Sequence, residues 1–100
     1  TATARHADIV LPACTAFEHN DITNIGTSSN DGFVAMKQAI EPQWESKPDY
    51  EIFSALADKL GIKQAYTEGR SQMDWIRKFY NDARQMGANL GQKMPDFDTF

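Results

Sequence analysis

A short apolar run near the start of the chain predicts a buried strand. Residues 8–12 read Asp-Ile-Val-Leu-Pro, so two β-branched residues and a leucine are followed at once by proline. A continuous apolar run is typical of a parallel strand that is covered on both faces, and proline cannot continue it. We therefore expect a buried strand at residues 8–12, with a loop opening at its carboxyl end.

Polar and small residues dominate the next part of the chain, residues 13–32, and predict a long loop. The pair Asp31-Gly32 is a turn signal. A loop of this length is uncommon in a compact domain and is usually functional or without fixed structure. We expect it to be mobile when no ligand is bound. Residues 33–40 follow the turn and stop at Glu41-Pro42, and we expect them to be extended rather than helical.

Two amphipathic helices are predicted in the second half of the chain. The first begins at Pro48 and stops near Gly61, and it carries an apolar stripe at helical spacing, formed by Ile52, Phe53, Leu56, Ala57 and Leu60. The second begins at Ser71, which has capping-box spacing with Asp74, and is expected to end near Gly87. Its expected buried face consists of Met73, Ile76, Phe79, Tyr80 and Ala83, with Trp75 beside it.

The fold class indicated by this order is α/β. One clear strand and one doubtful strand are too few to cover two amphipathic helices. We therefore expect a partial open sheet with two amphipathic helices, belonging to a larger dinucleotide-binding-like domain. The start at Thr1 and the end at Phe100 also lead us to expect that residues 1–100 are an internal piece of a longer protein.

Composition excludes several functions. The chain is 41% hydrophobic and 24% charged, with a net charge of −4, and it has no basic patch for nucleic acid. No apolar run approaches the ~20 residues of a membrane span. The single cysteine, Cys14, excludes an internal disulfide and a multi-cysteine zinc site. A reactive thiol would need a base or a cation beside it, so we interpret Cys14 as a small, half-buried residue.

The polar cluster Glu18-His19-Asn20-Asp21 admits three interpretations: a metal site, an acid–base catalytic site, or a wall around a ligand. Neighbouring loop residues point in different directions, and metal sites usually take ligands from several elements. The favoured interpretation is hydrogen bonds that anchor the loop or contact a ligand.

A carboxylate in the first turn of the first predicted helix, Asp49, has two possible roles. It complements the positive end of the helix dipole, or it reads guanine by accepting hydrogen bonds from the ring N–H and the amino group. Residue chemistry leaves both roles open. Trp44 and Trp75 are interpreted as packing anchors, and no glycine-rich phosphate loop is present.

Two phrases resemble the molybdopterin oxidoreductases, and more narrowly the dimethyl sulfoxide and trimethylamine N-oxide reductase branch. They are Ala-Arg-His-Ala-Asp-Ile-Val-Leu-Pro at residues 4–12 and Phe-Glu-His-Asn-Asp-Ile at residues 17–22. Further agreement lies at residues 35–38, 41–42, 49–53, 67–69, 75 and 94–97. The resemblance covers essentially all of the chain, and Met36-Lys37-Gln38 favours the trimethylamine N-oxide side.

The resemblance implies a segment of a catalytic subunit whose cofactor is bis(molybdopterin guanine dinucleotide) molybdenum. Such an enzyme removes an oxygen atom from an N-oxide or S-oxide, works in the periplasm, and receives electrons from a c-type cytochrome or another donor. The family's serine ligand to molybdenum matches no position here, so the resemblance assigns no catalytic residue and no metal ligand. We expect the isolated segment to be inactive, without bound cofactor, and dependent on the rest of the reductase chain.

Three positions match cofactor contacts of the family: Ala13 after the expected strand, His19 after the motif glutamate, and Asp49 at the start of the next helix. Relatives commonly carry arginine at the position of His19, which offers a fork of donors where a neutral histidine offers one. Cys14 stands where threonine is common, which indicates a substitutable residue.

Three functions follow from these observations. The favoured one is a cofactor-binding segment of a trimethylamine N-oxide reductase. The second is the same segment in a dimethyl sulfoxide or biotin sulfoxide reductase. The third is a stand-alone acidic α/β module that binds another protein.

Overall fold

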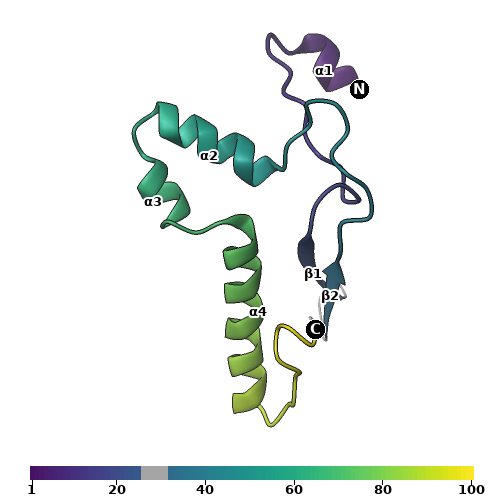
Figure 1. Ribbon diagram of the computed structural model, residues 1–100, viewed down its shortest axis with the longest axis vertical. Coiled ribbons are helices and arrows are strands. Elements are labelled where there is room, and N and C mark those ends of the chain that lie inside the picture. Colours follow the sequence, from purple (N-terminus) through teal and green to yellow (C-terminus); the bar gives the residue numbers. More distant parts are fainter. Residues whose placement is uncertain (26–31) are drawn as a thin grey trace.

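The computed structural model describes residues 1–25 and 32–100. Along the described chain the elements are α1 (Ala2–His6), β1 (Asp21–Ile25), β2 (Gly32–Met36), α2 (Asp49–Lys59), α3 (Lys63–Thr67) and α4 (Gln72–Asn89), as Figure 1 shows. The radius of gyration is 16.5 Å, compared with ~13 Å for a compact domain of this length. The molecule is therefore elongated.

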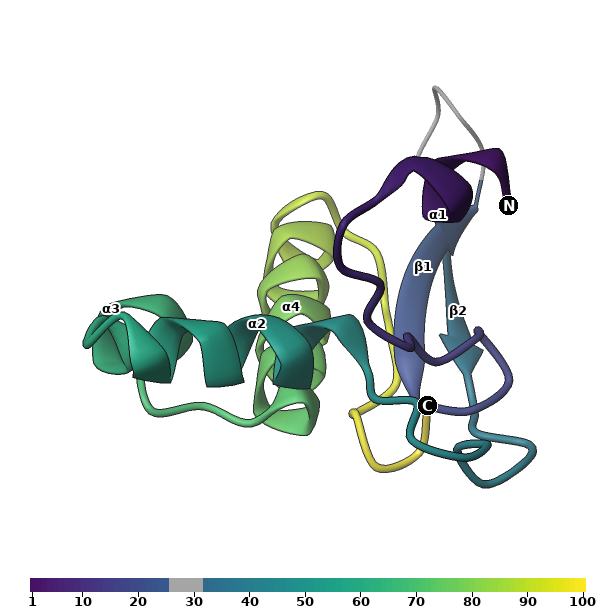
Figure 2. The same ribbon diagram turned by 90° about the horizontal axis from the view of Figure 1, so that it is seen from above.

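The sheet consists of two antiparallel strands. β1 pairs with β2 from Asp21 opposite Met36 to Ile25 opposite Gly32. Figure 2 shows the hairpin to the right of α4, with α2 running across in front of α4 to α3 on the left. α4 contacts β1, whereas α2 packs mainly on α3. The fold thus consists of a hairpin beside the long helix and a two-helix arm, formed by α2 and α3, near the N-terminal end of that helix.

The N-terminus of α4 is fixed by a complete capping box. The Ser71 hydroxyl oxygen accepts a hydrogen bond from the Asp74 N–H, and the Asp74 carboxylate accepts one from the Ser71 N–H. These bonds satisfy backbone donors that the first turn of a helix leaves without partners. The predicted start of this helix is confirmed, and residues in its first turns are held firmly in place.

The core is small and centres on Tyr80 of α4, whose side chain is 0% exposed. Its ring stacks on Phe100 at a centroid distance of 4.3 Å and meets Phe33 of β2 and Phe97 edge-on. The Tyr80 hydroxyl donates to the Pro95 carbonyl oxygen at 3.1 Å, and burial raises the pKa of this hydroxyl. One tyrosine thus joins the hairpin, the long helix and the C-terminal segment.

The expected strand at residues 8–12 is wrong. These residues form no strand, and Ile9, Val10 and Leu11 are 78%, 60% and 61% exposed. A strand needs a neighbour for its backbone groups, and in the described chain only Lys47 pairs with this region. A single parallel bridge joins Ala13 to Lys47, with hydrogen bonds from the Lys47 N–H to Pro12 and from the Cys14 N–H to Lys47.

The expected loop at residues 13–32 is only partly correct, because it contains β1 and the first residue of β2. The expectation that it is mobile falls in part on residues 26–31, which lie outside the described residues. The extended segment expected at residues 33–40 is confirmed as β2 as far as Met36. The sequence also did not predict α1, whose first turn is capped by the Thr1 hydroxyl accepting from the Ala4 N–H.

The two long helices and the partial α/β character are confirmed. The apolar stripe of α2 is buried only at Ala57, whereas Phe53, Leu56 and Leu60 are exposed. α4 continues past Gly87 to Asn89. A Cβ at position 87 would lie 3.3 Å from the Met94 sulfur. Gly87 therefore gives the returning chain room to approach the helix and does not end it.

A buried carboxylate, Glu18, joins two loops. Glu18 is 4% exposed and accepts hydrogen bonds from the Thr15 N–H (2.6 Å) and hydroxyl (2.8 Å), the Gln43 N–H (2.6 Å) and the Ser46 hydroxyl (3.2 Å). The bonds from the Thr15 and Gln43 backbone are the main cause that lowers the pKa of Glu18 from 4.5 to about 2. We call this set of bonds the Glu18 clamp. It holds the loop before β1 against the loop that leads into α2.

Replacing Tyr80 with alanine is expected to lower the free energy of unfolding by ~3–5 kcal/mol, because three aromatic contacts are lost. Tyr80→Phe keeps the ring and removes only the bond to Pro95, so a loss of ~1 kcal/mol is expected. Urea denaturation followed by circular dichroism measures both. Met86→Ala, at an exposed position of the same helix, is the control. Equal losses for the two Tyr80 variants would contradict the packing role of the ring.

The Glu18 clamp is expected to make stability depend on acidity. The pKa of Glu18 is lowered on folding, so its stabilisation is complete above pH 4.5 and is lost as the pH falls towards about 2. A Glu18→Gln variant should therefore melt well below the parent protein at pH 7, and the difference should shrink between pH 4.5 and 2. Thermal unfolding across this range measures the effect. Glu45→Gln, an exposed carboxylate in the loop that Glu18 binds, serves as control, and a gap that stays constant with pH argues against the ionised clamp.

Candidate functional site

Polar and aromatic side chains come together where the hairpin, the arm and α4 meet. A groove of about 560 Å³ opens there, within the ~300–1,000 Å³ usual for ligand sites. Its lining residues are His19, Asp21, Ile22, Asp49, Tyr50, Tyr66, Gln72, Trp75, Ile76 and Phe79. We call it the central groove. Because these residues come from four separate segments, tertiary structure alone assembles it.

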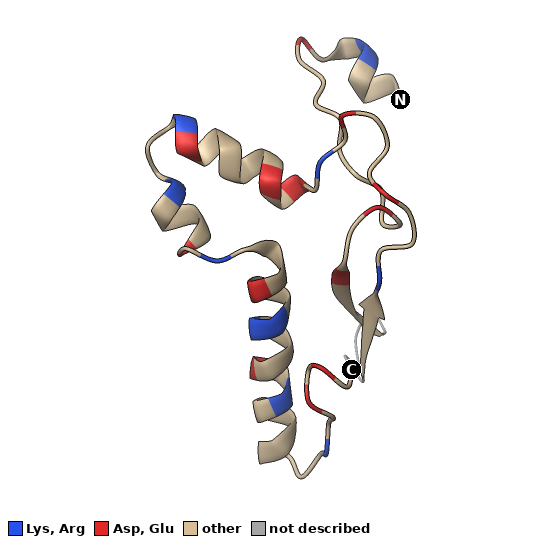
Figure 3. Cartoon of the chain, viewed as in Figure 1, with Lys and Arg blue, Asp and Glu red and all other residues tan. Residues whose placement is uncertain are grey.

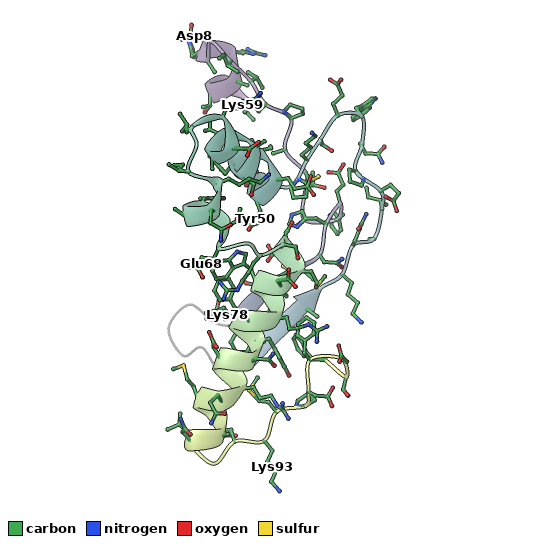
Figure 4. All side chains as sticks on the ribbon, turned by 60° about the vertical axis from the view of Figure 1, so that its left-hand side comes forward. Asp8, Tyr50, Lys59, Glu68, Lys78 and Lys93 are labelled. Atoms are coloured by element: carbon green, nitrogen blue, oxygen red, sulfur yellow. The ribbon has the colours of Figure 1, made fainter. Side chains whose placement is uncertain are left out.

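One wall of the central groove is aromatic and held by hydrogen bonds. Tyr50, labelled in Figure 4, donates from its hydroxyl to the Arg70 carbonyl oxygen at 2.6 Å and accepts from the Trp75 indole N–H at 3.1 Å. Tyr50 also stacks on Tyr66, and the Arg70 guanidinium lies 4.7 Å from the Trp75 ring centre. The polar tips of Tyr50 and Trp75 have partners, so these two rings are held in place in the wall of the groove.

An acidic group stands beside this wall. Asp49 lies in the first turn of α2, a turn that Figure 3 shows with acidic positions in red. Asp49 is exposed and lines the central groove, and its carboxylate has no hydrogen-bond or ion-pair partner in the described chain. Both carboxylate oxygens are therefore available to accept hydrogen bonds from a ligand.

The second predicted contact, His19, lines the same groove. It is half-buried, with its Nδ1 atom 3.1 Å from the Asn20 carbonyl oxygen and 3.2 Å from the Gln72 amide nitrogen. The structure thus brings His19 and Asp49 together, although 30 positions separate them in the sequence. The Glu18 clamp positions both, since Glu18 is next to His19 and binds the loop just before Asp49.

The third predicted contact, Ala13, is not part of the central groove. It is exposed and forms the parallel bridge to Lys47, two residues before Asp49. Its backbone therefore helps to place the start of α2. A contact between Ala13 and a cofactor stays a prediction.

Sequence reasoning missed Tyr50, Tyr66 and Gln72 as groove residues and interpreted Trp75 as a packing anchor. Trp75 does pack, on Phe79 at a centroid distance of 5.4 Å, but it also lines the groove. A signal was present, because positions 72, 75, 76 and 79 share one face of a helix. What the sequence could not show is that this face points to the loop that carries His19.

The polar cluster at residues 18–21 is used for anchoring at Glu18. In residues 1–25 and 32–100, no group of three or more His, Cys, Asp or Glu side chains is placed to bind a metal ion. Glu18 uses both of its oxygens in the clamp, which confirms the anchoring interpretation for that residue. Cys14 is a half-buried free thiol, as expected, with its sulfur 3.7 Å from the Ser46 hydroxyl. None of the described helices is long and apolar enough to cross a bilayer.

Comparison with known proteins adds independent information. The sequence pattern of the family described as molybdopterin oxidoreductase matches residues 1–59. The chain is 53% identical to a dimethyl sulfoxide/trimethylamine N-oxide reductase of Rhodobacter capsulatus. It is 48% identical to a trimethylamine-N-oxide reductase of Vibrio parahaemolyticus and 43% identical to trimethylamine-N-oxide reductase 1 of Escherichia coli.

Each of these alignments covers 100% of this chain and 12% of the relative. The chain thus spans about an eighth of the length of the proteins that it resembles, and the similarity continues through α3 and α4 beyond the matched residues 1–59. The family match covers more than half of the chain, and with the similarity over its whole length it shows that the chain belongs to the molybdopterin oxidoreductase family.

Proposed function

We propose that this chain forms part of the binding site for the guanine dinucleotide end of a molybdopterin cofactor, in a reductase that removes oxygen from trimethylamine N-oxide. The observation that carries the proposal is the convergence of Asp49, His19 and an aromatic wall in the central groove. Family membership supplies the cofactor class. The residues 1–100 would be one segment of the α/β domain that holds this cofactor.

The residues of the groove suit a guanine base. The Asp49 carboxylate can accept two hydrogen bonds, and guanine offers two adjacent donors on its ring N–H and amino group. Tyr66 and Phe79 are 42% and 53% exposed, so part of each residue is open to contact with a planar ring. His19 adds polar ring nitrogen atoms at the edge of the same groove. The donor set therefore fits the dinucleotide, with Asp49 giving base specificity.

The proposed roles of the cofactor and of this chain differ, because the described residues are suited to binding. When bound, the molybdenum and its pterins supply the redox chemistry. This chain would bind the nucleotide end, fix its orientation and cover it from water. No described side chain is proposed as a metal ligand or as a catalytic residue, since the clamp and the groove account for Glu18, His19 and Asp49 by binding alone.

Substrate and cellular setting are proposed on the resemblance of the chain. Several similar proteins are named trimethylamine-N-oxide reductases, which supports that substrate. Dimethyl sulfoxide is the second candidate, because the relative at 53% identity is named for both substrates. We further propose a periplasmic enzyme of anaerobic respiration that carries two guanine dinucleotides on its molybdenum and takes electrons from a c-type cytochrome.

The substrate proposal is tested with the full-length enzyme. It should reduce trimethylamine N-oxide with a higher kcat/KM than dimethyl sulfoxide, measured by oxidation of reduced methyl viologen. The comparison needs no variant, because both substrates are assayed separately with the same enzyme preparation. A higher kcat/KM for the sulfoxide would assign the protein to the second candidate.

Asp49→Asn is expected to weaken guanine binding roughly tenfold or more, because the new amide donates where guanine also donates. The measurement is the GMP released by acid hydrolysis per polypeptide of purified full-length enzyme, together with its molybdenum content. Glu51→Gln changes an acidic residue in the same turn of α2 and is the matched control. Wild-type GMP content in Asp49→Asn would exclude Asp49 as a guanine reader.

A further inference from the structure

A single side chain of α4 reaches across to the loop that carries His19. Gln72 is the first residue of α4, and its amide nitrogen donates to the Asn20 carbonyl oxygen at 3.1 Å. The same nitrogen lies 3.2 Å from Nδ1 of His19. Gln72 and His19 are 53 positions apart in the sequence. This contact therefore depends entirely on how α4 docks on the hairpin.

The chemistry of the contact defines the orientation of the Gln72 amide. A carbonyl oxygen can only accept hydrogen bonds, so Gln72 must direct its NH₂ group at Asn20. The reversed amide would place two acceptor oxygens 3.1 Å apart. Nδ1 of His19 lies beside this NH₂ group and beside the Asn20 oxygen: unprotonated it accepts from the NH₂ group, and protonated it donates to the oxygen that Gln72 also binds. One edge of the imidazole ring is therefore occupied by protein.

The opposite edge of the ring remains for a ligand. In the described chain, Nε2 of His19 has no hydrogen-bond partner, while His19 and Gln72 both line the central groove. They also both line a second hollow of about 350 Å³ next to the start of α2. The pair thus stands between two open volumes, where an unrestrained ring could turn towards either one.

Gln72 and Asn20, the two residues beside Nδ1 of His19, are each held in place by a further contact. Gln72 follows Ser71 in the capping box of α4, so its backbone is held in place. Asn20 is held by its own side chain, which accepts from the Gln38 N–H at 3.0 Å. A ring held in one orientation loses less conformational entropy when a ligand binds, and this raises affinity without a new ligand contact.

We propose that Gln72 is a positioning residue for His19. It holds the imidazole through Nδ1 so that Nε2 faces the central groove, and it raises the affinity for the guanine dinucleotide through His19 and not by touching the ligand itself. This inference rests on the proposed function of the groove, and it adds a residue that neither the sequence motif nor the resemblance assigned.

A double-mutant cycle tests this dependence in full-length holoenzyme. The measured quantity is the rate of cofactor release, followed as GMP that remains with the protein after gel filtration. Gln72→Ala should speed release about fivefold, the effect of one lost hydrogen bond. His19→Ala should speed it at least as much. The double variant should match His19→Ala within about twofold, because Gln72 has nothing left to position.

Factors that multiply in the double variant would overturn the proposal, since they would show that Gln72 acts independently of His19. An unchanged rate in Gln72→Ala would overturn it as well. Asp49→Asn, measured in parallel, distinguishes failure of the positioning role of Gln72 from failure of the proposed function of the groove. If it speeds release and Gln72→Ala does not, only the positioning role fails. If neither changes release, the proposed function of the groove fails too.

Two controls separate positioning from folding. Gln85→Ala changes the same residue type on an exposed part of α4 and should leave the release rate unchanged. Gln72→Met keeps the length of the side chain without its hydrogen bonds, and replaces the alanine variant if that one has a lowered melting temperature. The ring ¹⁵N signals of His19, assigned by their loss in His19→Ala, should shift in the Gln72 variant and not in Gln85→Ala. Unshifted signals in a folded Gln72 variant would contradict the contact.

Discussion

The arrangement of the site depends on one buried carboxylate. Glu18 accepts four hydrogen bonds and is almost fully shielded from water. A charged group in this position is stable only because every donor is in place. Two of the donors lie in residues 43–46, so the carboxylate joins the loop before β1 to the loop before α2. That connection places the segment before His19 against the segment before Asp49.

Polar contacts, more than apolar packing, also locate the first turn of α2. α2 contacts α3 but makes few contacts with the hairpin or α4, so apolar packing does little to locate its first turn. Polar contacts do this instead: the clamp, the bridge from Ala13 to Lys47, and the bond from Tyr50 to Arg70. Hydrogen bonds are directional and short-ranged, and for that reason they suit a site whose groups must be placed within a fraction of an ångström.

Many large apolar side chains lie on the outer faces of the chain. Ile9, Val10 and Leu11, with Phe53 and Leu56 of α2, are largely exposed, and a monomeric soluble protein rarely leaves so many large apolar side chains in contact with water. The Tyr80 core is correspondingly small. The central groove is therefore supported by a few well-satisfied polar contacts and one aromatic cluster, and not by an extensive hydrophobic interior.

The sequence by itself determined the elements whose signals are local. The helical spacing of apolar residues after Pro48 and the capping pair Ser71 and Asp74 predicted α2 and α4, because a helix is made from contacts between residues three and four apart. The phrase around Glu18 and His19 indicated loop-anchoring hydrogen bonds, which the Glu18 clamp confirms, while its role in binding a cofactor stays a prediction. The strand at residues 8–12 could not be decided in this way, since a strand exists only with a partner.

Tertiary structure alone decided the rest. It paired β1 with β2, placed Gly87 inside a helix beside Met94, and brought Gln72 to His19 and Tyr50 to Trp75. In each of these contacts, the sequence of one segment does not indicate which other segment it will meet. The physical reason is that a hydrogen bond or a ring contact depends on distance in space. A single sequence indicates that distance only for residues close together in the chain, where helical spacing or a capping motif already defines the backbone.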